Sequence, residues 1–122
     1  MKEISPQLQN QIQQYQQLQQ QLQVLGTQRL QLEAKLREVE GTLEELGKLP
    51  EKAPVYKSIG VLLVKADDRE ALKKELQEHQ ETLTIRVKSI QKQEKALGER
   101  FEDLQQKIQT ALGGGAAEPL GG

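Results

Sequence analysis

Cysteine is absent from the 122 residues, and only Tyr15, Tyr56 and Phe101 are aromatic. The absence of cysteine excludes disulfide bridges and thiolate metal sites. Because aromatic side chains normally supply much of the buried area of a compact core, we expect an elongated protein. The longest aliphatic stretch, residues 59–64, is far too short to span a membrane. Residues 1–6 have no apolar segment of the signal-peptide type, so nothing indicates secretion, and the compartment is otherwise left open.

An excess of charge of either sign is also lacking. The chain has 17 Lys and Arg against 18 Asp and Glu, for a formal net charge of −1. A nucleic-acid-binding protein usually has a net basic field, and a helical arm that grips nucleic acid needs a basic stripe. We therefore predict no nucleic-acid partner.

Groups that carry enzyme chemistry are scarce. His79 is the one histidine, and no cysteine or second histidine could help it bind a metal. No strand-linked glycine-rich phosphate loop occurs, and no Ser/His/Asp set can be assembled. We predict that the protein is not an enzyme and needs no cofactor.

Nearly half of the residues are Ala, Glu, Lys, Leu or Arg, and 20 more are Gln, a composition typical of long helices. Ser5-Pro6 is a helix start, and a seven-residue repeat then predicts a helix over about residues 5–47, with Gly47 as its C-terminal cap. The first positions of the repeat are Leu8, Tyr15, Leu22, Arg29, Leu36 and Leu43. The fourth positions are Gln11, Leu18, Leu25, Leu32, Val39 and Leu46.

A connector and a β-hairpin follow over about residues 48–66. Pro50 and Pro54 exclude a helix in the connector. The segment Val55–Lys65 is rich in β-branched residues, and we expect the chain to turn near Ile59-Gly60.

A second helix is predicted over about residues 68–112, with Asp67 and Glu70 as a capping box. It carries its own seven-residue line at Leu76, Leu83, Ile90, Leu97, Leu104 and Ala111. Residues 113–122 are rich in Gly, and we expect them to be disordered.

Helices of equal length joined by a hairpin predict an antiparallel pair. When residues of the two helices are paired so that their residue numbers sum to 119, the apolar positions of both helices lie opposite each other in a single register. Arg29 and Glu94 then fall in neighbouring layers, where they either form an ion pair or extend separately to solvent. The predicted fold class is therefore α-dominated: one domain over residues 1–122, a long antiparallel two-helix coiled coil joined by a β-hairpin.

The hairpin needs a partner, because the run from Val61 to Val64 is apolar on both faces of a strand. An isolated two-stranded hairpin is marginally stable in water. We expect the hairpins of several chains to assemble into an oligomeric β-barrel base. The alternative is that the chain's own connector and helix ends cover the hairpin. The predicted oligomerisation residues are Val55, Tyr56, Ile59, Gly60, Val61, Leu62, Leu63 and Val64.

The two chain ends also point to a partner. Residues 4–28 contain no charged residue and twelve Gln, although a coiled coil normally flanks its seam with Glu and Lys. Exposed apolar clusters usually mark interaction surfaces, and we prefer this reading to frayed ends with a low-complexity Gln surface. We call the two chain ends, at the far end of the predicted helix pair, the tips. Their predicted binding residues are Ile4, Leu8, Ile12, Phe101, Leu104, Ile108, Ala111 and Leu112.

The long helix, the segment Val55–Lys65 and the second long helix together resemble the prefoldin β subunit. The resemblance covers about residues 4–112, and its most specific part is Tyr56-Lys57-Ser58-Ile59-Gly60. Tyr15–Gln21, Leu83–Arg86 and Gln91–Glu94 are similar to archaeal members. One short hairpin favours the β class over the α class.

This resemblance implies a hexamer of two α and four β subunits, whose hairpins join in a double β-barrel base. It also implies that the coiled-coil tips hold non-native polypeptides without ATP and deliver them to a group II chaperonin. A chaperone of this kind is the expected function. The alternative is a structural coiled-coil tether with the hairpin as its joint, for which charged, fully heptad-coded tips would be typical.

Overall fold

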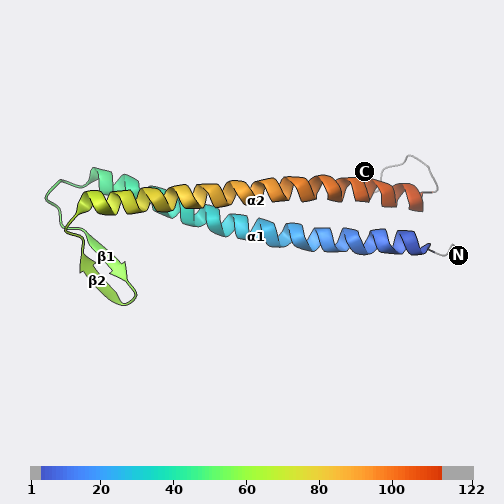
Figure 1. Ribbon diagram of the computed structural model, residues 1–122, viewed down its shortest axis with the longest axis horizontal. Helices are drawn as coiled ribbons and strands as arrows, with labels where there is room; N and C mark the ends of the chain where they lie inside the picture. The colour runs from blue at the N-terminus through green and yellow to red at the C-terminus, as the bar shows by residue number, and fades with distance from the viewer. Residues whose placement is uncertain (1–3, 114–122) are drawn as a thin grey trace. The chain divides into compact units, whose positions relative to one another are not determined.

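The computed structural model describes residues 4–113 as two long helices and a hairpin (Figure 1). Their order is α1 (Pro6–Lys48), β1 (Tyr56–Ile59), β2 (Leu62–Lys65) and α2 (Arg69–Leu112). The predicted helix-dominated fold, with two long helices joined by a two-stranded antiparallel hairpin, is confirmed, and both helices begin and end within a residue or so of the predicted bounds. The expected disorder of residues 113–122 concerns a segment that, apart from Gly113, lies outside the described residues.

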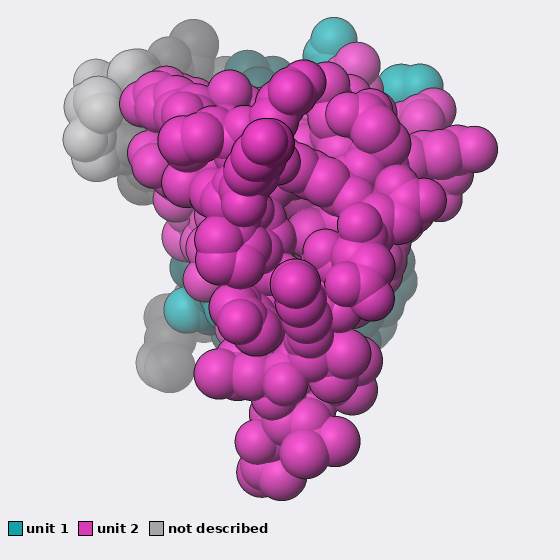
Figure 2. All heavy atoms as spheres, turned by 90° about the vertical axis from the view of Figure 1, so that its left-hand side faces the viewer, with its two compact units in different colours: residues 1–29, 89–122 teal, residues 30–88 magenta. Residues whose placement is uncertain are grey.

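The chain divides into two compact units, which Figure 2 colours separately. Unit 1 contains residues 1–29 and 89–122, and unit 2 contains residues 30–88. Each unit therefore holds a stretch of α1 and a stretch of α2, and unit 2 also holds the hairpin. The single domain expected over residues 1–122 stays a prediction.

The core of each unit is the predicted apolar seam. Unit 1 buries Leu8, Leu18 and Leu104, and unit 2 buries Leu32, Val39, Leu46, Leu83 and Val87. The remaining positions of the heptad lines are half-buried, except Ala111, which is exposed. This burial pattern follows the seven-residue spacing, because residues at that spacing return to the same side of a helix.

One side-chain layer departs from the pairing proposed above. The rings of Tyr15 and Phe101 stack with their centroids 4.5 Å apart, whereas the proposed register put Phe101 opposite Leu18. The ring contact therefore joins two neighbouring layers of the proposed register, because aromatic side chains reach beyond the residue directly opposite.

The ends of α1 are held by side chains of different kinds. At its start, Ser5 Oγ accepts a hydrogen bond of 3.1 Å from the Leu8 backbone N–H, as predicted for a cap. At its end, the prediction for Gly47 is wrong, because the helix continues through Lys48 and Gly47 does not have a positive φ. Instead, the Arg69 guanidinium donates to the carbonyl oxygens of Leu46, Leu49 (2.9 Å) and Pro50 (2.7 Å). A cation is favourable there because helix C-termini carry partial negative charge.

The cap of α2 is one residue later than predicted. Asp68 Oδ1 accepts a 3.0 Å hydrogen bond from the Ala71 N–H, so Asp68 takes the role assigned to Asp67, and the capping box with Glu70 does not form as stated. Both aspartates suit a helix start, and which of the two caps depends on the path of the chain after the hairpin.

The hairpin turns one residue later than expected. Its antiparallel pairs run from Tyr56↔Lys65 to Ile59↔Leu62, which leaves Gly60 and Val61 as the turn. Gly60 has φ +57°, a left-handed conformation that costs an L-residue energy but not glycine. A positive φ at the first of two turn residues suits the right-handed twist of hairpin strands.

Over residues 4–113, neither helix has a stretch apolar and long enough to cross a membrane. In the same range, no three His, Cys, Asp or Glu side chains are grouped so that they could hold a metal ion.

Candidate functional site

Seven of the eight predicted oligomerisation residues lie together on the hairpin and are exposed, and Val55, just before β1, is half-buried. Side chains that face each other across the ladder share one face of the sheet. One face therefore carries Ile59, Leu62 and Val64 with Lys57, and we call it the hairpin's apolar face. The other face alternates Tyr56 and Leu63 with Ser58 and Lys65. Of the apolar run Val61–Val64, Leu62 and Val64 thus share one face, Leu63 lies on the other, and Val61 lies in the turn.

The chain's own connector does not cover these side chains. Leu62 is 62% exposed and Leu63 74% exposed, and Val61 in the turn is fully exposed. Exposed apolar side chains grouped on so small a sheet, with unpaired strand edges on either side, favour pairing with another chain.

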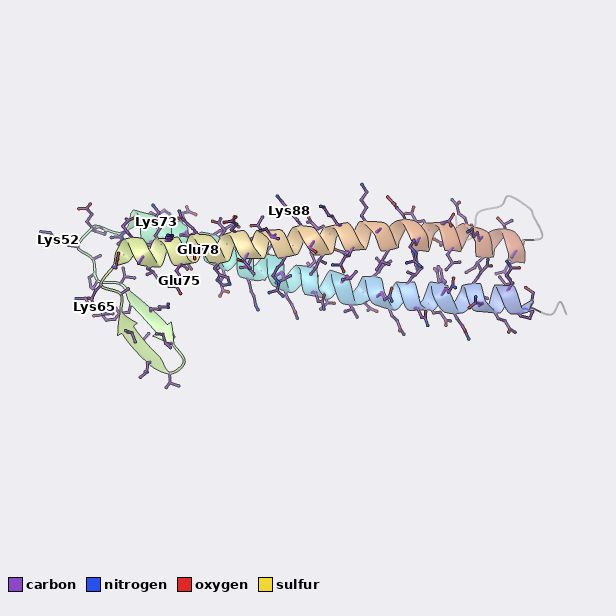
Figure 3. The ribbon with its side chains drawn as sticks, viewed as in Figure 1. Lys52, Lys65, Lys73, Glu75, Glu78 and Lys88 are labelled. Carbon is purple, nitrogen blue, oxygen red and sulfur yellow. The ribbon has the colours of Figure 1, made fainter. Side chains whose placement is uncertain are left out.

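An ion pair ties the hairpin to α2. Lys57 Nζ donates to both carboxylate oxygens of Glu75, at 2.7 and 2.9 Å. Figure 3 labels Glu75 on the stretch of α2 beside the hairpin, with Lys65 at the base of β2. Since both groups are well exposed, the pair contributes little stability, but it fixes one rim of the apolar face.

The second candidate surface lies at the chain ends, in unit 1. Of the eight predicted tip residues, Ile4, Ala111 and Leu112 are exposed, and Ile12, Phe101 and Ile108 are half-buried. Leu8 and Leu104 are buried in the seam. Six of the eight predicted residues are therefore exposed or half-buried, and the other two are buried in the seam.

Three of these eight residues, Ile12, Ile108 and Leu112, line a groove of about 380 Å³, which we call the tip groove. Its apolar lining is Ile12, Tyr15, Ile108 and Leu112, and its polar lining is Gln16, Gln19, Gln105 and Gln109. None of the eight carries a charge. A neighbouring hollow of unit 1 differs, because Asp103 and Lys107 line it and form an ion pair at 3.2 Å.

The four glutamines and Tyr15 were not among the predicted tip residues. The available signal was their position in the repeat, since several of these glutamines flank the apolar seam where charged residues are usual. Reading only the apolar residues for binding therefore missed the polar half of the groove.

Comparison with known proteins shows the family of the chain. A family model described as "Prefoldin subunit" matches residues 9–115. The chain is 53% identical over 112 residues to a prefoldin subunit beta of Archaeoglobus fulgidus, which covers 92% of this chain and 96% of the relative. The chain belongs to the prefoldin family.

Other prefoldin relatives agree. A prefoldin subunit beta of Thermoplasma volcanium is 46% identical over 105 residues, covering 86% of this chain and 85% of that one. The crystal structure of the prefoldin beta subunit from Thermococcus strain KS-1 superposes with a TM-score of 0.84 at 37% identity, covering 98% of this chain and all of that one. Prefoldin membership identifies the chain as a chaperone subunit that assembles with other prefoldin subunits. The exposed apolar face of the hairpin is a surface suited to such assembly.

Proposed function

We propose that the chain is an ATP-independent, non-enzymatic holdase subunit that captures non-native polypeptides at its tips and delivers them to a group II chaperonin in the cytoplasm. In this proposal the hairpin residues join two α-type and four β-type chains in one hexamer. The client-binding residues are the eight tip residues predicted from the sequence, with Leu8 and Leu104 supporting the other six from the seam.

The tip groove is the observation that carries the proposal. Its lining combines four apolar side chains with four amides and no charge, and Leu112 at its edge is 56% exposed. An unfolded chain offers apolar side chains in no fixed order. An uncharged surface accepts many such segments, because it contains no buried ion that a mismatched partner would leave unpaired.

A single tip is expected to bind weakly. Its few half-exposed side chains contribute about 1–3 kcal/mol each when fully buried, and ordering the client offsets much of this. Several arms joined at one base hold the same client much more firmly, because every contact after the first is intramolecular. The proposal thus requires both surfaces, one to join the arms and one to bind.

The test begins with the mass of the assembly. The chain is measured by sedimentation alone and with a candidate α-type subunit, and each assembled form is then added to a test protein that aggregates as it unfolds. We expect a defined hetero-oligomer that suppresses aggregation without ATP. An assembly of the expected mass that leaves aggregation unchanged would contradict the holdase and favour the tether.

A further inference from the structure

A second uncharged groove lies in unit 1, away from the predicted tip residues. It has a volume of about 570 Å³, and we call it the arm groove. Its apolar side chains are Val24, Leu25 and Leu97, and the other five lining residues are all glutamines, among them Gln21 and Gln28. The ion pair of Arg29 and Glu94 does not line it.

Val24 is the most informative residue of this groove. Its side chain is 56% exposed, although it lies on a long helix whose seam residues are buried or half-buried. Leu25 beside it belongs to the seam, so Val24 extends the apolar surface outward from the seam. Gln17, Gln21, Val24 and Gln28 are spaced by three or four residues and therefore form one stripe along α1.

From this arrangement we propose that the arm groove is a second client site that binds an extended, uncharged polypeptide segment through its main chain. A glutamine amide offers both a donor and an acceptor, which matches the N–H and C=O of each peptide group. Val24, Leu25 and Leu97 contact the side chains between these peptide groups. Recognition of this kind depends little on client sequence, since every residue except proline presents the same two groups.

The dimensions fit this occupant. Gln17 to Gln28 covers about 16 Å of helix at 1.5 Å per residue. An extended chain rises about 3.3 Å per residue, so about five client residues match this length. Charge complementarity agrees, because a charged client segment would find no opposite charge among the lining residues.

This inference rests on the proposed function, and its test keeps the two apart. The assembled, full-length protein carries Ile108→Gln and Leu112→Gln, which we call the tip-blocked variant, so that the tip groove contributes little. The probe is a fluorescent, uncharged peptide of about ten residues made of Leu, Thr and Gln. A second probe has the same side chains but N-methylated amides, which lack the N–H donor.

Val24→Gln removes exposed apolar surface from the groove without adding charge. In the tip-blocked variant we expect it to weaken peptide binding about fivefold, the loss of partial burial of one valine. The matched control is Leu30→Gln, since Leu30 is a similarly exposed apolar residue of α1 (61%) that does not line the groove. Equal effects of the two substitutions, or no residual binding in the tip-blocked variant, would overturn the inference and leave the tip proposal standing.

The main-chain contacts are tested by Gln21→Met with Gln28→Met, which keeps side-chain length but removes the amides. We expect weaker binding by about threefold, from the loss of modest hydrogen bonds, and a smaller preference for the normal over the N-methylated peptide. Gln14→Met with Gln23→Met, at exposed positions outside the groove, should change neither value. Tighter binding by the groove variant would show purely apolar recognition and overturn this part.

Two further results would exclude either the inference or the proposed function on which it rests. If Val24→Gln changes the mass of the assembly, the occupant is another subunit and the inference is wrong. If the unmodified assembly neither binds the peptide nor suppresses aggregation, the proposed function itself fails.

Discussion

Arg29 and Glu94 place an ion pair in a seam that is otherwise mostly apolar. Arg29 Nε donates to Glu94 Oε1 at 2.6 Å, and the two side chains are only 29% and 22% exposed. Of the two alternatives left open by the sequence, the paired one is present. Since a half-buried charge without its partner is costly, the pair disfavours registers that would separate the two residues.

Removing one partner should therefore cost more than removing both. We expect Arg29→Met or Glu94→Met alone to lower the free energy of unfolding by about 1–3 kcal/mol, between the values for exposed and buried pairs. The double variant Arg29→Met with Glu94→Met should recover at least half of the loss. Chemical denaturation at fixed protein concentration measures this, and strictly additive effects in the double variant would show that the pair does not couple.

Gly60 is the other residue whose identity is dictated by geometry. Alanine at φ +57° is strained by about 1–2 kcal/mol, so Gly60→Ala should destabilise the hairpin and weaken assembly. Gly41 in α1 is the matched control, because a Cβ there meets nothing within 4 Å. Gly41→Ala should raise stability by about 0.5–1 kcal/mol. Sedimentation measures the assembly of both variants, and thermal unfolding measures their stability. A Gly60→Ala assembly as stable as the parent would show that alanine is not strained at this position.

At the scale of elements, the hairpin's apolar face should drive assembly. Leu62 and Val64 lie on that face and are exposed in the single chain. Leu62→Lys with Val64→Lys places two charges where another subunit would pack, which should dissociate the oligomer and leave helix content nearly unchanged. The control is Leu30→Lys with Ile85→Lys, two exposed apolar residues of the same unit away from the hairpin. Sedimentation that still shows the full assembly with both hairpin lysines would mean that the joint lies elsewhere.

The sequence predicts these elements well because their signals are periodic. Twelve heptad positions identify the seam of α1, and an error at one of them does not move the helix. Features that depend on a single residue, such as a helix cap or a turn, have no repeated signal of this kind. Asp68 rather than Asp67 caps α2, and the turn lies at Gly60-Val61 rather than Ile59-Gly60, because adjacent residues offer nearly equal local chemistry and the tertiary path selects one.

Contacts between distant residues outside the heptad seam were beyond prediction. Arg69 holds the end of α1 from the start of α2, and no pattern in the sequence pairs an arginine with carbonyls about twenty residues away. The polar lining of the grooves was missed for a related reason, because the sequence marks the region as uncharged and rich in Gln but does not show which glutamines line a groove. The apolar tip residues were predicted because composition alone marks that region.

At the scale of the whole molecule, the proposed function assigns assembly and client binding to different parts of the chain. The hairpin belongs to unit 2 and the tip residues to unit 1, so substitutions at one surface should leave the other intact. A tip-blocked chain should therefore still assemble, while a hairpin-disrupted chain should keep its tip groove and lose the benefit of several arms.

The most direct measurement of the central claim compares aggregation suppression by the assembled protein, the tip-blocked variant and a control with Leu30→Gln and Ile85→Gln. We expect the tip-blocked assembly to keep its mass and lose most of its holding activity, while the control holds fully. Leu112→Gln alone, at an exposed position, should give a smaller loss and exclude unfolding as the cause. Holding should also persist at moderate salt, because exposed ion pairs are screened within about 8 Å at physiological ionic strength whereas apolar contacts are not. Full activity of the tip-blocked assembly, or holding by the parent that vanishes at moderate salt, would contradict capture in the uncharged tip groove.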